Sequence, residues 1–329
     1  MEFFHEFLRD TIYSKNYRLQ DDKRALATVH VQAWPDHPKS AAYCDYPPEK
    51  LRKLRNNILS IYKDRLLRNG LAPGVHEHET PLFKVHFDFD HVTVPIVDPC
   101  PFFNVAIKNF ISWFYTNCCD STFNKKRTVY VVTSFDVGNQ GIQDQCGIHL
   151  YFEETVVSTV MEAVGEFAKD YFDNHLKGIF GEQSSLDTGI YGGLKSMRLP
   201  FCRKGGNPFD NDDRPYVPFN IYEYNPKDDT CKIVRTEQER KKIGEIIEVA
   251  DIDERATLME QFERAEVDDA MLQRYSDNCT MQVFLNPKPN LYKIFLIRSE
   301  LGVYMRAKVD KTKLKILERE VEGKYLKVI

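Results

Sequence analysis

Long hydrophobic runs are missing from this sequence. No stretch approaches the roughly 18 consecutive apolar residues of a membrane-spanning helix, and the acidic and aromatic start, Met1 to His5, lacks the basic and apolar regions of a signal peptide. The chain also has no low-complexity tract, no repeat and no Gly-x-x-x-x-Gly-Lys-Ser/Thr loop, so it does not itself carry the motor that such a loop indicates. We therefore expect an intracellular protein, in the cytoplasm or the nucleus, without a membrane partner.

Cysteines at the spacing typical of zinc-binding pairs are absent as well. The chain has eight cysteines but no Cys-x-x-Cys pair. A zinc site would have to be assembled from scattered residues, whereas zinc ligands normally lie close together in sequence. The candidates for such a site would be His76, His78, Cys100, Cys118 and Cys119. We therefore expect reduced, buried thiols and no structural zinc.

An excess of positive charge, which many nucleic-acid-binding proteins show, is also lacking. The net charge is −4, but its distribution is uneven. Residues 236–280 carry 13 acidic against 6 basic side chains, and residues 281–329 carry 5 against 11. The basic end could contact phosphates or pair with the acidic segment before it, and the charge pattern leaves both open.

The length of 329 residues exceeds that of a typical single domain, so we expect a sizeable α+β domain with a smaller appendage. Residues 1–80 are expected to form a helical N-terminal part, residues 81–225 a core, and residues 226–329 a C-terminal α/β module with acidic helices and a basic β-rich end.

Apolar periodicity predicts the secondary structure. Helices are expected over 51–66, 102–117, 158–180, 237–247 and 252–275. Strands are expected over 83–90, 129–135, 147–152, 186–187, 196–199, 219–224, 282–285, 292–298 and 303–309.

The most informative segment is the predicted strand that contains Asp88 and Asp90. Apolar side chains alternate with polar ones, so Phe83, Val85, Phe87 and Phe89 share one face, and Lys84, His86, Asp88 and Asp90 share the other. Two carboxylates at this spacing lie roughly 6.6 to 7 Å apart along the strand. Because like charges repel, a cation is expected between them, and carboxylate oxygens suit Mg²⁺ or Mn²⁺. The alternative is surface acids on an edge strand, and His86 could support the acids or only pack.

Two further segments could contribute to the same site. His149 lies on the polar face of its strand, where it could bind a phosphate or be an ordinary polar residue. Asp187 could be a third acid or open a turn, and Arg198 could bind phosphate through two hydrogen bonds or pair with an acid. The segment after Asp187 is glycine-bearing and basic, with Lys195, Arg203 and Lys204 as further phosphate ligands.

Together, these segments resemble the archaeo-eukaryotic primase superfamily. In that family an Asp-x-Asp strand, an x-His strand and a hydrophobic-Asp strand form the polymerase site, and here they correspond to Asp88-Phe89-Asp90, Gly147-Ile148-His149 and Leu186-Asp187. Asp187-Thr188-Gly189-Ile190-Tyr191 and Met197-Arg198-Leu199 look like the arrangement in primase-polymerases (PrimPols) and large-DNA-virus primases. The resemblance covers roughly residues 84–224. The chain departs from it at Gly147, where the family often has Ser, and at Gln145, where PrimPols commonly have Lys.

The resemblance implies a fold and an activity. The fold would be an α+β primase-type catalytic core, with mixed sheets and an RRM-like β-unit flanked by helices. The activity would be template-directed nucleotidyl transfer from NTPs or dNTPs in DNA replication. Asp88, Asp90 and Asp187 would hold two Mg²⁺ or Mn²⁺ ions, and His149 and Arg198 would bind the triphosphate, with Lys195, Arg203 and Lys204 as secondary ligands.

The resemblance also implies partners. These are a single-stranded DNA template, the NTP or dNTP, and a replicative helicase, either separate or fused to the chain. Because no zinc-binding module is evident after Asn225, the sequence favours primer extension over priming de novo. Two other function classes stay open, namely a catalytically inactive nucleic-acid-binding subunit of a replication complex and a metal-dependent nuclease.

Overall fold

The computed structural model describes part of the chain. The described residues are 17, 19–20, 23, 27–32, 42–68, 74–93, 99–119, 124–136, 145–191, 196–202, 215–234, 269–283, 293–294 and 326–327. Lys195, Arg203 and Lys204 lie outside them, as do the predicted helix 237–247 and the predicted strand 303–309. The same holds for most of the predicted helix 252–275.

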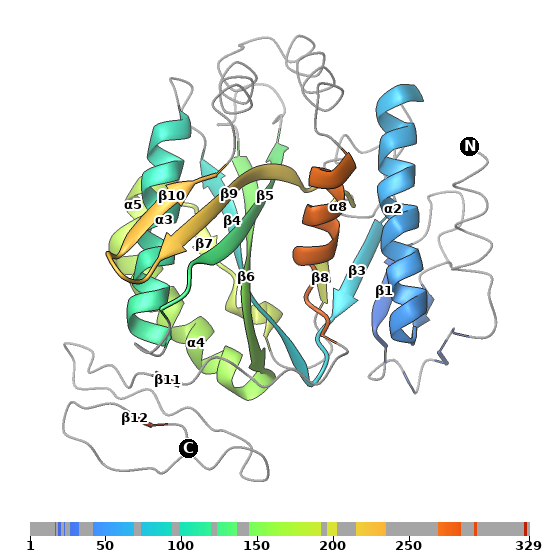
Figure 1. The fold of residues 1–329 in the computed structure, drawn as a ribbon, viewed down its shortest axis with the longest axis horizontal. Coiled ribbons are helices and arrows are strands. Elements are labelled where there is room, and N and C mark those ends of the chain that lie inside the picture. The colour runs from blue at the N-terminus through green and yellow to red at the C-terminus, as the bar shows by residue number, and fades with distance from the viewer. Residues whose placement is uncertain are drawn as a thin grey trace.

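The described part of the chain is a mixed α+β structure with two main antiparallel sheets (Figure 1). The larger sheet has the strand order β10-β9-β5-β6-β4-β7, and the smaller one has the order β2-β1-β3-β8. The strands are β1 Val29–Gln32, β2 Ala42–Cys44, β3 Gly74–His78, β4 Leu82–Thr93, β5 Arg127–Asp136, β6 Gln145–Val157, β7 Ser185–Leu186, β8 Ser196–Arg198, β9 Val217–Asn225 and β10 Thr230–Ile233. A third, two-stranded sheet pairs β11 Lys293–Ile294 with β12 Leu326–Lys327.

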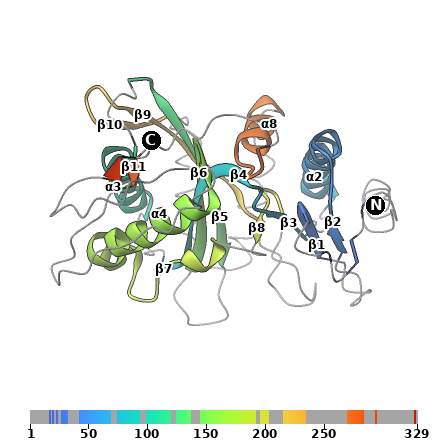
Figure 2. The same cartoon turned by 90° about the horizontal axis from the view of Figure 1, so that it is seen from below.

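Helices flank both main sheets. They are α2 Pro48–Arg68, α3 Pro99–Cys118, α4 Ser158–Tyr171, α5 Lys177–Phe180 and α8 Asp269–Asn278, with a π-helical turn at Phe172–Leu176 and a 3₁₀ turn at Thr188–Ile190. Figures 1 and 2 place α3 and α4 on one side of the six-stranded sheet, and the four-stranded sheet with α2 on the other. Within the described ranges, no helix combines the length and the hydropathy that crossing a membrane requires.

The burial predicted for the apolar residues of β4 is confirmed, but strict alternation is interrupted, because the pairing with β6 shifts register between Lys84 and His86 and the Phe83 and His86 rings lie 5.5 Å apart. Phe83, Val85, Phe87 and Phe89 are all at most 1% exposed. The Phe87 ring meets the Phe110 ring of α3 edge to face, with centroids 4.9 Å apart. Phe87 and Phe89 both pack against Phe110 of α3, which leaves the opposite side of this part of β4 for Asp88 and Asp90.

Three strands in the N-terminal part were not predicted. β1, β2 and β3 all lie within residues 1–80, which the sequence analysis expected to be helical. They are three to five residues long, too short for an apolar alternation to be recognised, and β3 contains glycine and two histidines beside its apolar residue.

The expectation of mixed sheets is wrong for the described strand pairs, which are all antiparallel. Alternation along a strand does not determine the direction of the neighbouring strand, so the sequence could not predict this.

Two described parts of the predicted C-terminal module, β10 and the segment from α8 to Met281, contact the main sheets. β10 pairs with β9 and so extends the six-stranded sheet. α8 lies beside α2 (Figure 1), and the segment from α8 to Met281 bonds to both sheets. Arg274 donates to the Tyr130 hydroxyl of β5 at 2.9 Å, and the Met281 amide donates to the Glu77 carboxylate of β3 at 2.7 Å. α8 thus connects the two sheets.

Candidate metal centre

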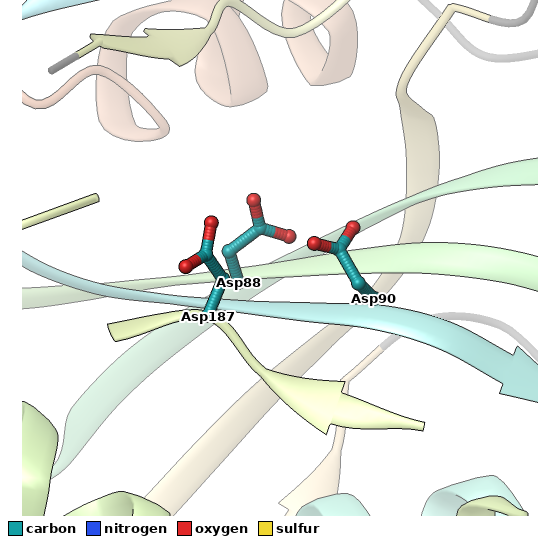
Figure 3. A group of neighbouring side chains, drawn as sticks. All are labelled: Asp88, Asp90 and Asp187. Atoms are coloured by element: carbon teal, nitrogen blue, oxygen red, sulfur yellow. The ribbon is translucent and has the colours of Figure 1, made fainter. Parts of the chain in front are cut away.

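Three carboxylates gather on the polar side of the six-stranded sheet. Asp88 and Asp90 project from β4, and Asp187 follows β7, which pairs with β4 through Phe89 and Leu186. The Asp187 amide donates to the Asp88 carbonyl oxygen at 2.9 Å, which places Asp187 beside the acidic strand. One carboxylate oxygen from each residue lies within 4.8 Å of the others, and no other such group of metal-ligating side chains occurs in the described ranges (Figure 3).

This geometry fits a divalent cation. Oxygen ligands bind Mg²⁺ and Ca²⁺ at about 2.0 to 2.6 Å, so two oxygens on one ion are at most about 5 Å apart. The three carboxylates meet that limit. In addition, Asp88 Oδ1 is buried, with His149 Nε2 at 3.3 Å, and a bound cation would further compensate the charge of this carboxylate.

Asp187 also has a structural role. Its Oδ1 accepts a hydrogen bond of 2.7 Å from the Gly189 amide, so it caps the 3₁₀ turn Thr188–Ile190. The two alternatives left open by the sequence therefore coexist. Asp187 Oδ1 accepts the hydrogen bond at the start of the turn. The same carboxylate group lies beside those of Asp88 and Asp90.

His149 lies directly across from Asp88 in the pairing of β6 with β4. Its Nε2 is 3.3 Å from Asp88 Oδ1, and its Nδ1 is 3.2 Å from the Tyr151 hydroxyl. Burial lowers the pKa of His149, although the charge of Asp88 partly opposes this. Burial would raise the pKa of Asp88, but the proximity of His149 and the charge of Arg198 outweigh burial and lower it. At neutral pH Asp88 is therefore ionised and His149 is neutral.

Arg198 reaches this site from the other sheet. It ends β8, whose pairing with β3 sets Arg198 opposite His76. The Tyr151 hydroxyl of β6 donates to the Arg198 carbonyl oxygen at 3.3 Å, which ties the two sheets together at this point. Asp88, Asp90, Asp187 and His149 thus lie together, and Arg198 is close enough for its charge to lower the pKa of Asp88.

His86, whose role the sequence left open, is a packing residue in this structure. It is fully buried, its ring lies 5.5 Å from the Phe83 ring and 5.4 Å from the Tyr191 ring, and its Nδ1 is 3.0 Å from the Lys84 carbonyl oxygen. Burial lowers the pKa of His86 to about 4, so it is neutral at pH 7.

The sequence analysis missed Tyr216. This buried residue precedes β9, and its ring contacts both predicted phosphate ligands. The centroid of the ring lies 3.5 Å from that of His149 and 4.5 Å from Arg198 Cζ. No motif in the sequence marks it, because a single tyrosine before a strand is most often a core residue.

Comparison with known proteins gives no family for this chain, since no protein-family model and no curated protein matches it. The function therefore has to be argued from the geometry of the site itself.

Proposed function

We propose that this chain is a metal-dependent nucleotidyltransferase of the primase-polymerase type, which adds nucleotides to a strand paired with a single-stranded DNA template. The observation that carries the proposal is the convergence of three carboxylates with a neutral histidine and an arginine. Acidic groups suited to divalent cations then lie beside groups suited to a triphosphate.

The topology around the acids supports the proposed primase-type core. β4, α3, β5, β6, α4 and β7 follow one another as β-α-β-β-α-β, and the strands lie in the order β7-β4-β6-β5. The first strand of this succession therefore neighbours the third and the fourth, as in ferredoxin-like and RRM-like units. Because the first and third strands are adjacent, Asp88 and His149 face the same space.

Each side chain has a role in the proposed reaction. Asp88, Asp90 and Asp187 would hold the two Mg²⁺ or Mn²⁺ ions. When bound, such ions promote ionisation of a primer 3′-hydroxyl and neutralise charge on the phosphate under attack. The 3′-oxygen forms a bond to the α-phosphorus of the nucleotide, and the bond to pyrophosphate breaks. Arg198 and His149 would hold the triphosphate in line for this displacement.

The test is nucleotide incorporation by the purified protein. A single-stranded template is supplied with labelled NTPs or dNTPs and with Mg²⁺ or Mn²⁺, with and without a primer. The Asp88→Ala/Asp90→Ala variant is expected to make no product. Asp170→Ala/Asp173→Ala, which removes two exposed carboxylates from α4 and the π-helical turn, is the matched control and should stay active.

The outcomes separate the candidate functions. Product without primer indicates a primase, and product only with primer indicates a polymerase that does not initiate. Full activity in Asp88→Ala/Asp90→Ala would overturn the assignment. Metal-dependent shortening of labelled DNA would instead indicate a nuclease, and template binding without product would indicate a catalytically inactive subunit.

A further inference from the structure

Tyr216 links the two parts of the chain that carry the predicted phosphate ligands. Its amide donates to the Cys202 carbonyl oxygen at 3.3 Å, and its carbonyl oxygen accepts from the Phe201 amide at 2.8 Å. Residues 201–202 follow β8, which ends at Arg198, whereas Tyr216 leads directly into β9 of the larger sheet. The Tyr216 backbone is therefore fixed between the segment that carries Arg198 and the sheet that carries His149.

The side chain of Tyr216 contacts both ligands. Its ring stacks on the His149 imidazole at a centroid distance of 3.5 Å and an interplanar angle of 27°. The Arg198 guanidinium carbon lies over the same ring, 4.5 Å from its centroid, within the range of a cation–π contact. One aromatic ring therefore limits the rotamers of two side chains that come from different sheets.

Gly147 provides the space for this ring. Gly147 lies two residues before His149 on β6 and therefore on the same face. A Cβ atom at Gly147 would lie 2.2 Å from the Tyr216 hydroxyl oxygen and 3.1 Å from Tyr216 Cζ, too close for the present ring position. The Ser134 hydroxyl, 3.2 Å from the same point, closes another side of this space. Any larger residue at position 147 would have to displace Tyr216.

We propose that Tyr216 is a positioning residue, whose ring holds His149 and Arg198 in the orientation that binds the nucleotide triphosphate, and that Gly147 is required to admit this ring. The inference rests on the proposed function of the site. Without the ring, both side chains gain conformations in which they do not face the acids, so nucleotide binding and alignment should both weaken.

The first test compares two tyrosines of the same segment. Tyr216→Leu keeps apolar volume but removes the flat face, and it should lower kcat/KM for the nucleotide about 10- to 100-fold, mainly through a higher KM. Tyr216→Phe keeps the ring and should stay within about 3-fold of the wild type, because stacking does not need the hydroxyl. Tyr224→Leu is the matched control. Tyr224 is also buried and lies at the other end of β9, stacked on Tyr115 at 4.5 Å, so its loss should leave the nucleotide KM unchanged.

The results distinguish the inference from the proposed function. A wild-type protein without nucleotidyl transfer defeats the proposed function. An active wild type with an unchanged KM in Tyr216→Leu overturns the positioning role. An equal loss in Tyr216→Leu and Tyr224→Leu would also overturn it, because the effect would then come from general loss of packing.

The second test addresses Gly147 through stability and does not depend on activity. Gly147→Ala should lower the midpoint of urea unfolding, because the new methyl group and the Tyr216 ring compete for one space. Gly147→Ala/Tyr216→Ala has no ring at this place, so its loss of unfolding free energy should be smaller than the sum of the losses of the two single variants. Strictly additive losses would show that Gly147 does not make room for Tyr216.

Discussion

At the scale of single residues, Asp187 combines a structural role with a role in the candidate site. Its carboxylate caps the 3₁₀ turn through Gly189 and lies within 4.8 Å of the oxygens of Asp88 and Asp90. Capping needs only an oxygen acceptor, whereas a metal site needs the negative charge. The two roles can therefore be separated by a substitution that keeps the acceptor and removes the charge.

We predict that Asp187→Asn folds with nearly unchanged stability and loses nucleotidyl transfer by at least about 100-fold. The amide oxygen of Asn can still accept the Gly189 hydrogen bond, since Asn and Asp are comparable caps, but it is a weaker ligand for a hard cation. Asp187→Ala should lose activity as well and should also lose about 1 kcal/mol of unfolding free energy with the cap. Urea unfolding and the incorporation assay measure the two effects. If Asp187→Asn keeps full activity, Asp187 is only a cap.

The sequence predicts the acids of this site better than their supports. Asp88 and Asp90 are marked by alternation along one strand, which is local information. Tyr216 and Gly147 acquire their roles through a contact between residues far apart in the chain. Such a contact has no periodic signal, so it could be found only once the strands had been placed in space.

At the scale of elements, Glu77 of β3 joins three segments. Its carboxylate lies 2.7 Å from Arg55 Nη2 of α2 and accepts the Met281 amide at 2.7 Å, and the residue is 1% exposed. The ion pair and the hydrogen bond together compensate a buried charge. Removing the carboxylate leaves a mostly buried arginine and a buried amide without these acceptors.

We predict that Glu77→Ala lowers the free energy of unfolding by about 3 to 5 kcal/mol, as expected when one partner of a buried ion pair is removed. Glu223→Ala is the matched control, because Glu223 pairs with Lys126 at the same 2.7 Å but both side chains are at least one-third exposed. That exposed pair should contribute less than about 1 kcal/mol. Urea unfolding monitored by circular dichroism compares the two variants. Similar losses would mean that Glu77 does not hold the segments together.

The elements predicted from sequence are those with long, regular patterns. α2, α3 and the strands β4, β5, β6 and β9 were all expected near their observed positions. The short strands β1 to β3 were not, and neither was β10, whose four residues are half polar. The helix expected over 158–180 is interrupted by the π-helical turn Phe172–Leu176, because apolar periodicity does not distinguish a single wide turn from continuous α-helix.

At the scale of the whole molecule, the candidate site is assembled where the two sheets meet. The acids and His149 belong to the larger sheet, and Arg198 belongs to the smaller one. The order of the motifs in the sequence suggested one site for these residues, but it did not predict that they come from separate sheets, since sheet membership depends on pairing between distant strands. α8 and the backbone pairing of residues 201–202 with Tyr216 hold the two sheets in place.

The proposed metal centre has a consequence for the stability of the whole chain. The three carboxylate oxygens are held within 4.8 Å of one another only in the folded protein, so an ion that needs all three binds the folded chain alone. An ion that binds only the folded chain should stabilise it by about 2.7 kcal/mol at a concentration 100 times its dissociation constant.

We therefore predict that Mg²⁺ or Mn²⁺ raises the Tm of the wild type by several degrees relative to the protein in EDTA. The Tm of Asp88→Asn/Asp90→Asn should not respond to either ion, because two of the three carboxylates that would bind the ion are gone. Asp170→Asn/Asp173→Asn, with exposed acids, should respond like the wild type. Equal Tm values of the wild type in Mn²⁺ and in EDTA would contradict the metal centre. This would hold even if the three acids proved essential for activity, since the acids would then act without a bound ion.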